Sequence, residues 1–143
     1  MTTVMAFGTF DLLHPGHLYC LKKAKKLGGK LVVVVARDTS VKQVKGAYPV
    51  FDEKHRLELV KELKIVDKAV LGHDFVRDKT RIVKEFKPDI IALGYDQKPG
   101  NEELSKELEK INWQGKIVRI RPLKESIYKT SKIKEKIKSL LKK

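Results

Sequence analysis

Short apolar runs alternate along this chain with longer stretches in which apolar residues recur at helical spacing. The runs of strand length cover residues 4–7, 31–36, 67–71, 89–93 and 116–120. The stretches with helical periodicity cover residues 15–27, 52–63, 77–86, 102–111 and 131–141. Strands that alternate with helices predict parallel βαβ units, with right-handed crossovers and helices on both faces of the sheet. We therefore expect an α/β protein: a single Rossmann-like doubly wound domain over residues 1–143, with a parallel sheet of about five strands.

The size and composition of the chain limit what kind of protein it can be. Its 143 residues match one ordinary domain, and a hydrophobic fraction of 41% is enough for a packed core. The longest apolar run, residues 31–36, is far shorter than the ~20 residues of a membrane span, and no signal-peptide pattern opens the chain. The single cysteine, Cys20, excludes an internal disulfide and a cysteine-rich zinc site. We expect a soluble cytoplasmic protein without a membrane partner.

The chain is strongly basic, with 32 lysines and arginines against 18 aspartates and glutamates and a formal net charge of +14. Such an excess attracts polyanions, which include nucleic acids, nucleotides and phosphorylated metabolites. The lysines are spread along the predicted helices, and the sequence contains neither a nucleic-acid recognition motif nor a basic strip interleaved with aromatic residues. We therefore attribute most of the charge to a solvated lysine-rich surface, and a nucleic-acid partner is disfavoured.

Polar side chains gather where three of the predicted strands end. Residues 8–11 with His14 and His17 follow the first strand, residues 37–38 follow the second, and residues 94–97 follow the fourth. The carboxyl ends of parallel strands meet at one edge of a sheet, where open α/β sheets bind their ligands at the switch point of the strand order. These three clusters are therefore expected to converge on one site.

His14 and His17 lie where the first strand passes into the first helix. Helix N-termini bind phosphate through free backbone N–H groups and the positive end of the helix dipole. Pro15 suits the first helical turn, and Gly16 leaves room for a close-lying phosphate. We interpret this stretch as a nucleoside triphosphate site with both imidazoles directed at the phosphates. Two alternatives stay open: a zinc site with Asp11 as a third ligand, and a structural role in capping or packing the helix start.

The stretch GTFDLLHPGH at residues 8–17 closely resembles the GTFD-x-x-HxGH signature of the cytidylyltransferase-like nucleotidyltransferases. Further similarity follows in the same order along the chain. Residues 41–46 resemble a mobile lysine loop of that family, and Arg56 matches an arginine of the next helix. Residues 128–133 resemble the Ser/Thr-rich helix start that closes the family's site. The resemblance covers nearly the whole chain and implies an enzyme that transfers a nucleotidyl group.

In that family an acceptor phosphate attacks the α-phosphorus of a nucleoside triphosphate in line, and pyrophosphate leaves. The protein contributes mainly positioning and charge neutralisation. The resemblance implies catalytic roles for His14, His17 and Lys45, with Lys42 as a second candidate lysine. It implies that the nucleotide is bound by the two histidines together with Thr9, Phe10, Pro15, Gly16, Arg56, Asp96, Tyr128, Thr130 and Ser131. Mg²⁺ is expected with ATP, held mainly by phosphate oxygens and water, so that no protein metal ligand is expected.

Several of these residues also have ordinary structural explanations. Arg56 could pair with Glu53 on its own helix, and Asp96 could cap the turn that follows it. Residues 130–131 could cap the last helix, a role that is compatible with phosphate binding. Asp11 is expected to brace its loop rather than to bind metal.

The acceptor is indicated by residues 94–97. Their sequence GYDQ resembles the corresponding stretch of archaeal-type FAD synthetases rather than the GDDW of glycerol-phosphate enzymes. On this resemblance ATP is the donor, FMN the acceptor, and FAD and pyrophosphate are the products. One alternative is a CTP-dependent cytidylyltransferase acting on glycerol 3-phosphate or another phosphoalcohol, and a second is a nucleic-acid-binding domain without catalysis. Lys129 departs from the pattern, which more often has serine, and a homodimer is expected because relatives commonly pair.

Flavin recognition itself leaves little trace in the sequence. An isoalloxazine ring needs an apolar slot, and aromatic side chains are suited to line one. The candidates, all of which also suit core or edge positions, are Tyr48, Phe51, Phe75 and Trp113.

Overall fold

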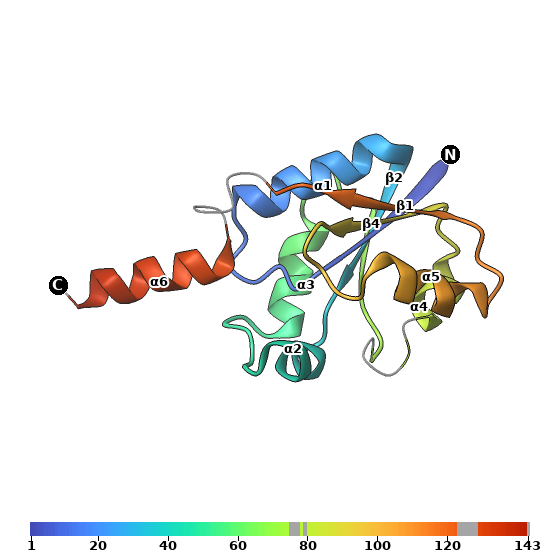
Figure 1. Cartoon of the computed structure of the whole chain (residues 1–143). Coiled ribbons are helices and arrows are strands. Elements are labelled where there is room, and N and C mark those ends of the chain that lie inside the picture. The colour runs from blue at the N-terminus through green and yellow to red at the C-terminus, as the bar shows by residue number, and fades with distance from the viewer. Residues whose placement is uncertain (75–77, 79, 123–128, 143) are drawn as a thin grey trace.

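The strands of the computed structural model form one sheet in which all neighbouring strands run parallel (Figure 1). The structure describes residues 1–74, 78, 80–122 and 129–142. Within these ranges the strands are β1 (Thr2–Gly8), β2 (Gly29–Val35), β3 (Lys68–Leu71), β4 (Ile90–Gly94) and β5 (Lys116–Ile120). Their order across the sheet is β3-β2-β1-β4-β5. The parallel sheet expected from the alternating pattern is confirmed.

The strand order reverses at β1. The chain first adds β2 and β3 on one side of β1 and then crosses to the other side, where β4 pairs with β1 and β5 pairs with β4. The carboxyl ends of β1 and β4 therefore flank the switch point, which is where open α/β sheets bind their ligands. The stretch of residues 8–17 leaves the sheet at this place.

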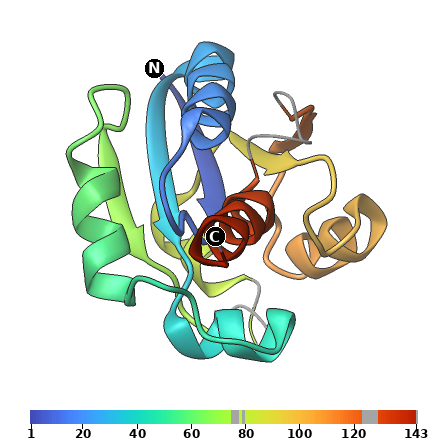
Figure 2. The ribbon, with the colours of Figure 1, turned by 90° about the vertical axis from the view of Figure 1, so that its left-hand side faces the viewer.

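Helices cover both faces of the sheet (Figure 2). In the described part of the chain they are α1 (Pro15–Gly28), α2 (Asp38–Lys45), α3 (Glu53–Lys61), α4 (Arg81–Phe86), α5 (Asn101–Glu109) and α6 (Thr130–Leu141). Side chains of α1 and α3 share one hydrophobic cluster with the sheet, and side chains of α4 and α5 share a second one. This separation into two layers of helices confirms the doubly wound architecture.

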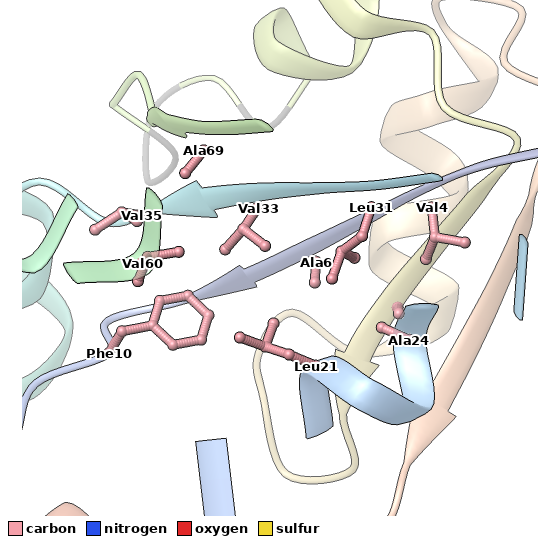
Figure 3. Close-up of a cluster of buried hydrophobic side chains, with 11 residues drawn as sticks. Val4, Ala6, Phe10, Leu21, Ala24, Leu31, Val33, Val35, Val60 and Ala69 are labelled. Carbon is pink, nitrogen blue, oxygen red and sulfur yellow. The ribbon is translucent and has the colours of Figure 1, made fainter. Parts of the chain in front are cut away.

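The side chains of β1 alternate between these two clusters, as the two-residue period of a strand requires. Val4 and Ala6 belong to the cluster beneath α1, whereas Met5 belongs to the opposite one. Figure 3 shows the first cluster, where Leu21 and Ala24 of α1 lie below the strands. Burying one large aliphatic side chain contributes about 1.5–3 kcal/mol. The core thus fixes β1 and α1 on either side of the stretch that joins them.

Two helices differ from the expectations. Residues 41–46 were expected to form a loop, but α2 occupies most of them and ends at Lys45, with Gly46 after it in the left-handed conformation (φ 80°). With only eight residues, α2 offers too few turns for a clear period. The fourth helix begins at Arg81 rather than at residue 77, because the Asp78 carboxylate accepts hydrogen bonds from the backbone N–H groups of Thr80 and Arg81 and holds a turn there.

The last helix, α6, projects from the rest of the molecule (Figure 1). None of its residues is buried. Its first turns are nevertheless attached to the loop after β1 through Thr130 and Lys134, which both contact Asp11. Across the helices in the described ranges, none combines the length and the apolar character that crossing a membrane requires.

Candidate active site at the carboxyl ends of β1 and β4

The loop after β1 turns sharply before α1 begins. Phe10 and Leu12 adopt positive φ values of 56° and 51°. The Phe10 side chain points back into the core, where it is 6% exposed (Figure 3). A Cβ atom on Gly8 would lie 2.7 Å from Cζ of this ring, so the turn depends on glycine at position 8. Phe10 was expected to line the nucleotide site; its ring belongs to the core cluster and also lies beside the His17 ring, with centroids 5.5 Å apart.

His14 and His17 cap the start of α1 with their side chains. Nδ1 of His14 accepts a hydrogen bond from the backbone N–H of Gly16 at 3.1 Å, and Nδ1 of His17 accepts one from the backbone N–H of His14 at 3.3 Å. The ring centroids are 3.8 Å apart. The capping alternative is therefore realised, but it uses one nitrogen of each ring and leaves Nε2 on the opposite side.

This arrangement changes which groups the start of α1 presents to an anion. Free backbone N–H groups were expected there. Pro15 has no N–H, and that of Gly16 is already bonded to the His14 side chain. Imidazole nitrogens therefore replace backbone N–H groups as the available donors.

Both imidazoles are neutral near pH 7. Burial, with smaller contributions from the charges of His14 and Lys45, lowers the pKa of His17 from its ordinary value of 6.5 to about 3. Burial also lowers the pKa of His14. A ring nitrogen that accepts a hydrogen bond carries no proton, so each neutral ring carries its proton on Nε2. Each histidine can therefore donate an N–H hydrogen bond to a phosphate oxygen without bringing in a charge.

Lys45, the last residue of α2, extends across to the loop after β1. Its Nζ donates to the Thr9 hydroxyl oxygen at 3.3 Å. Burial of the ammonium group and repulsion by Lys134 lower the pKa of Lys45, while the charge of Asp11 opposes this change. Lys45 and Thr9, which were each expected to contribute to the site, therefore lie together. Lys42, by contrast, donates to the carbonyl oxygen of Gly46 at its own helix end.

Asp11 braces the site, as expected, and does so through both its backbone and its side chain. The carboxylate is 3% exposed and accepts the backbone N–H groups of Val50 at 2.7 Å and Phe51 at 3.0 Å. Its Oδ2 lies 3.6 Å from Nζ of Lys134. The backbone oxygen of Asp11 accepts the Thr130 hydroxyl at 2.9 Å. Asp11 therefore joins the segment before α3 and the start of α6 to the histidine loop.

Arg56 does not take the role expected of it. Its side chain is fully buried, so it does not reach a phosphate in this conformation. The guanidinium donates to the carbonyl oxygens of Thr9 at 2.7 Å and Phe51 at 2.9 Å, and it pairs with Oδ1 of Asp38 at 2.7 Å. The alternative partner, Glu53, instead lies 3.3 Å from Arg37. Arg56 is therefore a buried support for the loop after β1 and the start of α2.

The loop after β4 and the start of α6 approach each other at the other side of the site. Nζ of Lys129, the residue that caps α6, lies 3.6 Å from Oδ2 of Asp96. The departure from the family pattern at position 129 thus places a cation against the exposed Asp96 carboxylate. Ser131 is exposed on the first turn of α6, and Tyr128 lies outside the described residues.

Two contributors were not predicted individually as site residues, although Gln97 belongs to the cluster of residues 94–97 that was expected there. Gln97 donates from Nε2 to the carbonyl oxygen of Phe7 at 3.0 Å and accepts the N–H of Gly94 at 2.6 Å, which ties the end of β4 to the end of β1. Lys134 was hidden among the many lysines of the last helix. Its position four residues after Thr130 was the available signal, because residues at this spacing share a helix face.

The aromatic candidates for a flavin slot are distributed over both edges of the sheet. Trp113 precedes β5, and its indole N–H donates to the carbonyl oxygen of Pro88 before β4, so it lies at the opposite edge from the histidines. Phe51 stacks on His55 with ring centroids 3.9 Å apart, directly beside the Asp11 contact. Tyr48 is exposed near Lys42, and Phe75 lies outside the described residues.

The zinc alternative finds no donor set. Among the described side chains, no group of three or more histidines, cysteines, aspartates and glutamates is arranged to hold a metal ion. The Asp11 carboxylate is occupied by two backbone N–H groups, and Nδ1 of each histidine by one. Neutral imidazole N–H donors beside two ammonium groups are suited to phosphate oxygens.

Comparison with known proteins identifies the family of this chain. The sequence model of the cytidylyltransferase-like family matches residues 5–139. Proteins named FAD synthase from Thermoplasma volcanium and Methanothermus fervidus are 48% and 54% identical to this chain, covering 99% and 95% of it and 97% and 94% of their own lengths. The crystal structure of a lipopolysaccharide core biosynthesis protein from Thermoplasma volcanium matches with a TM-score of 0.81 and 52% identity, covering 86% of this chain and 98% of that one. Sequence, fold and site together assign this chain to the cytidylyltransferase-like family of nucleotidyltransferases.

Proposed function

We propose that this enzyme transfers the AMP group of ATP to the phosphate of FMN, giving FAD and pyrophosphate. The relatives named FAD synthase support this reaction, because they match almost the full length of the chain at about half identity. The observation that carries the chemistry is the pair of neutral imidazoles whose Nδ1 atoms are bonded to the start of α1. Cytidylyl transfer to a phosphoalcohol and nucleic-acid binding without catalysis are not favoured.

The two histidines would act on the phosphate that is transferred. In-line attack by the FMN phosphate brings a second anion to the α-phosphorus, and negative charge builds up on its oxygens. The Nε2–H groups of His14 and His17 would donate hydrogen bonds to those oxygens. Because the helix start already holds both rings, little reorganisation is needed as the charge develops, which is the basis of electrostatic preorganisation.

The two lysines would neutralise the phosphates. Lys45 and Lys134 are close enough to repel each other, which is one cause of the lowered pKa of Lys45. The negative charge of a bound polyphosphate would outweigh this repulsion and favour the charged form of Lys45. The contact of Lys45 with Thr9 keeps its ammonium group over the loop after β1.

The start of α6 offers a second anion site. Its capping residue, Lys129, makes no side-chain capping bond, and the first turn holds no acidic residue. Backbone N–H groups there can meet phosphate oxygens, with the Ser131 hydroxyl beside them. Thr130 is expected to contribute through its backbone, because its hydroxyl already donates to Asp11.

Several expectations accompany this proposal. Mg²⁺ would be carried by the triphosphate and its water, and it would neutralise charge on the phosphate oxygens. We also propose a homodimer, a cytoplasmic place of action and a single domain over residues 1–143. The oligomeric state can be measured by light scattering.

A substrate panel tests the reaction. The protein is mixed with Mg²⁺, with ATP or CTP as donor, and with FMN or glycerol 3-phosphate as acceptor. Pyrophosphate is assayed and the products are separated by chromatography. We expect FAD to form only with ATP and FMN. Turnover only with CTP and a phosphoalcohol would reject the proposal, and a His17→Asn variant prepared in parallel shows whether any turnover comes from this site.

A further inference from the structure

Arg119 of β5 makes an unusual set of contacts with the loop that follows β4, residues 94–100. Its Nη1 donates to the carbonyl oxygens of Gly94 at 2.9 Å and Gln97 at 2.7 Å. Its Nη2 donates to the carbonyl oxygen of Pro99 at 2.8 Å. Its Nε donates to Oδ1 of Asn101, the first residue of α5, at 2.7 Å. One guanidinium thus binds three carbonyl oxygens of a single loop and one side-chain oxygen of the helix that follows it.

The same loop is also attached to the carboxyl ends of β5 and β1. The backbone N–H of Tyr95 donates to the carbonyl oxygen of Ile120, and the Gln97 side chain reaches the carbonyl oxygen of Phe7 at the end of β1. The Asp96 carboxylate lies between these anchors and meets Lys129 at the start of α6. Asp96 is also close enough to act on the charge of Lys45, so the loop borders the phosphate site.

We propose that Arg119 is a positioning residue that shapes the 94–100 loop into the wall that receives the nucleoside part of ATP. The inference rests on the proposed function, because it names the part of the site that binds the adenosine. Arginine suits this role because its planar fork presents five donors in fixed directions, whereas a lysine ammonium offers a point charge on a flexible stem. Arg119 itself contacts loop oxygens, and it acts on the nucleotide only through the loop.

Because the loop borders the nucleotide site, the role proposed for Arg119 differs from general support of the fold. The 94–100 loop leaves β4 at the switch point, beside the histidine loop, and open α/β sheets bind nucleotides at this place. Loss of the guanidinium frees the carbonyl oxygens to rotate, and the loop then pays the entropic cost of ordering each time a nucleotide binds. The effect should therefore appear in ATP affinity and leave the transfer step at saturating ATP nearly unchanged.

The test uses direct ATP binding by calorimetry alongside steady-state kinetics with ATP and FMN. We expect Arg119→Met to raise the Kd and KM for ATP at least ~10-fold and to leave kcat and the KM for FMN within ~3-fold, because only the preorganisation of the nucleoside wall is lost. Arg119→Lys should give a similar loss despite keeping the charge. The matched control is Arg81→Gln on α4, an exposed arginine whose ion pair with Glu85 is remote from the loop.

Asn101→Ala supplies a milder variant. Asn101 is exposed, and its replacement removes only one of the four acceptors of Arg119, so we expect the variant to fold. We expect it to weaken ATP binding ~2–3-fold. Unchanged ATP affinity in folded Arg119→Lys or Arg119→Met, or in Asn101→Ala if the arginine variants do not fold, would overturn the inference. An equal fall in kcat with unchanged KM would also overturn it. If the wild type binds ATP but forms no FAD, the proposed function fails, while the binding measurements still decide the role of Arg119.

Discussion

The hydroxyl group of Thr130 donates a hydrogen bond to the backbone oxygen of Asp11 at 2.9 Å, although the two residues are 119 positions apart in the sequence. The Lys134 ammonium, one turn further along α6, lies 3.6 Å from the Asp11 carboxylate. Since no residue of α6 is buried, these polar contacts rather than apolar packing attach its first turns to the histidine loop. The helix start that we assign to the phosphates is therefore placed by Asp11.

Replacing Thr130 with valine removes this hydroxyl and keeps the side-chain shape. We expect Thr130→Val to raise the KM for ATP ~10-fold, because a loosened α6 presents its N-terminus to the phosphates less often, while the fold keeps its stability within ~1 kcal/mol. Steady-state kinetics and urea unfolding measure the two effects. Ser139→Ala is the control on the same helix, because it removes an exposed hydroxyl two turns away from the Asp11 contact. Equal ATP affinity of Thr130→Val and wild type would contradict the role of this bond.

Replacing Arg56 tests its role as a buried support. Arg56→Met leaves Asp38 without its cationic partner and the carbonyl oxygens of Thr9 and Phe51 without their donor. We expect the free energy of unfolding to fall by about 3–5 kcal/mol, which is typical of breaking a buried pair on one side. Arg56→Lys keeps the charge but cannot reach all three partners, so it should also destabilise the protein. Urea unfolding provides the measurement.

Exposed Arg81 offers the matched control for this experiment. Arg81→Gln should change the free energy of unfolding by no more than ~0.5 kcal/mol, because surface substitutions of this kind seldom have larger effects. A stable Arg56→Met protein with strongly weakened ATP binding would show that Arg56 does contact the phosphates, contrary to its position in the structure.

The sequence was sufficient to predict the sheet and the place of the site. Strand and helix periods differ clearly in runs of the length of β2 and α1, and parallel strands bring their polar carboxyl ends together whatever the side-chain details. The joint position of Thr9, His14 and His17 after β1 follows from this rule, whereas Lys45, at the end of α2, was indicated only by the family resemblance. The glycine of the GTFD stretch also indicated a turn after β1. The structure explains this glycine, because a Cβ atom at position 8 would have no room.

What the sequence could not supply was the partner of each charged group. The sequence pattern around an arginine does not show whether its guanidinium contacts a phosphate or backbone oxygens. The guanidinium of Arg56 is enclosed by backbone oxygens from distant positions in the sequence. The four contacts of Arg119 depend on the path of a loop, which periodicity does not describe. The pattern offered capping of the helix start as an alternative to phosphate binding, but it did not indicate that one nitrogen of each imidazole would cap while the other stayed available.

We expect the fall of kcat/KM for ATP at alkaline pH, the alkaline limb of the pH profile, to reflect the loss of the Lys45 charge. Burial and repulsion by Lys134 lower its pKa, so the free enzyme loses this charge at a pH below the ordinary value of 10.5. Because the charged form neutralises phosphate, kcat/KM for ATP should fall as the pH rises through that lowered pKa. Lys45→Arg keeps its charge throughout and should move this fall to higher pH. Lys42→Arg on the same helix should leave the limb unchanged, and an identical limb in wild type and Lys45→Arg would exclude Lys45 as its source.

We expect the free energy of unfolding in acid to depend on the protonation of His17. Its pKa is about 3 in the folded protein against an ordinary value of 6.5, so between these values the unfolded chain binds a proton that the folded protein does not. The free energy of unfolding therefore falls as the pH drops below 6.5, by up to about 1.4 kcal/mol per pH unit for one such group, and this term is absent above that pH. His14, whose pKa is also lowered, adds to the same trend.

His17→Asn isolates this contribution. The asparagine amide oxygen can still accept the N–H of His14, but the side chain neither titrates nor presents a donor where Nε2 stood. We expect the variant to lose stability less steeply than wild type between pH 6.5 and pH 4.5, and to turn over at least ~100-fold more slowly at pH 7. Urea unfolding across this range gives the slopes, and carboxylates such as Asp67 cancel because both proteins carry them. Parallel slopes would place His17 in solvent, whereas a shallower slope with unchanged turnover would leave it a helix cap without a part in the reaction.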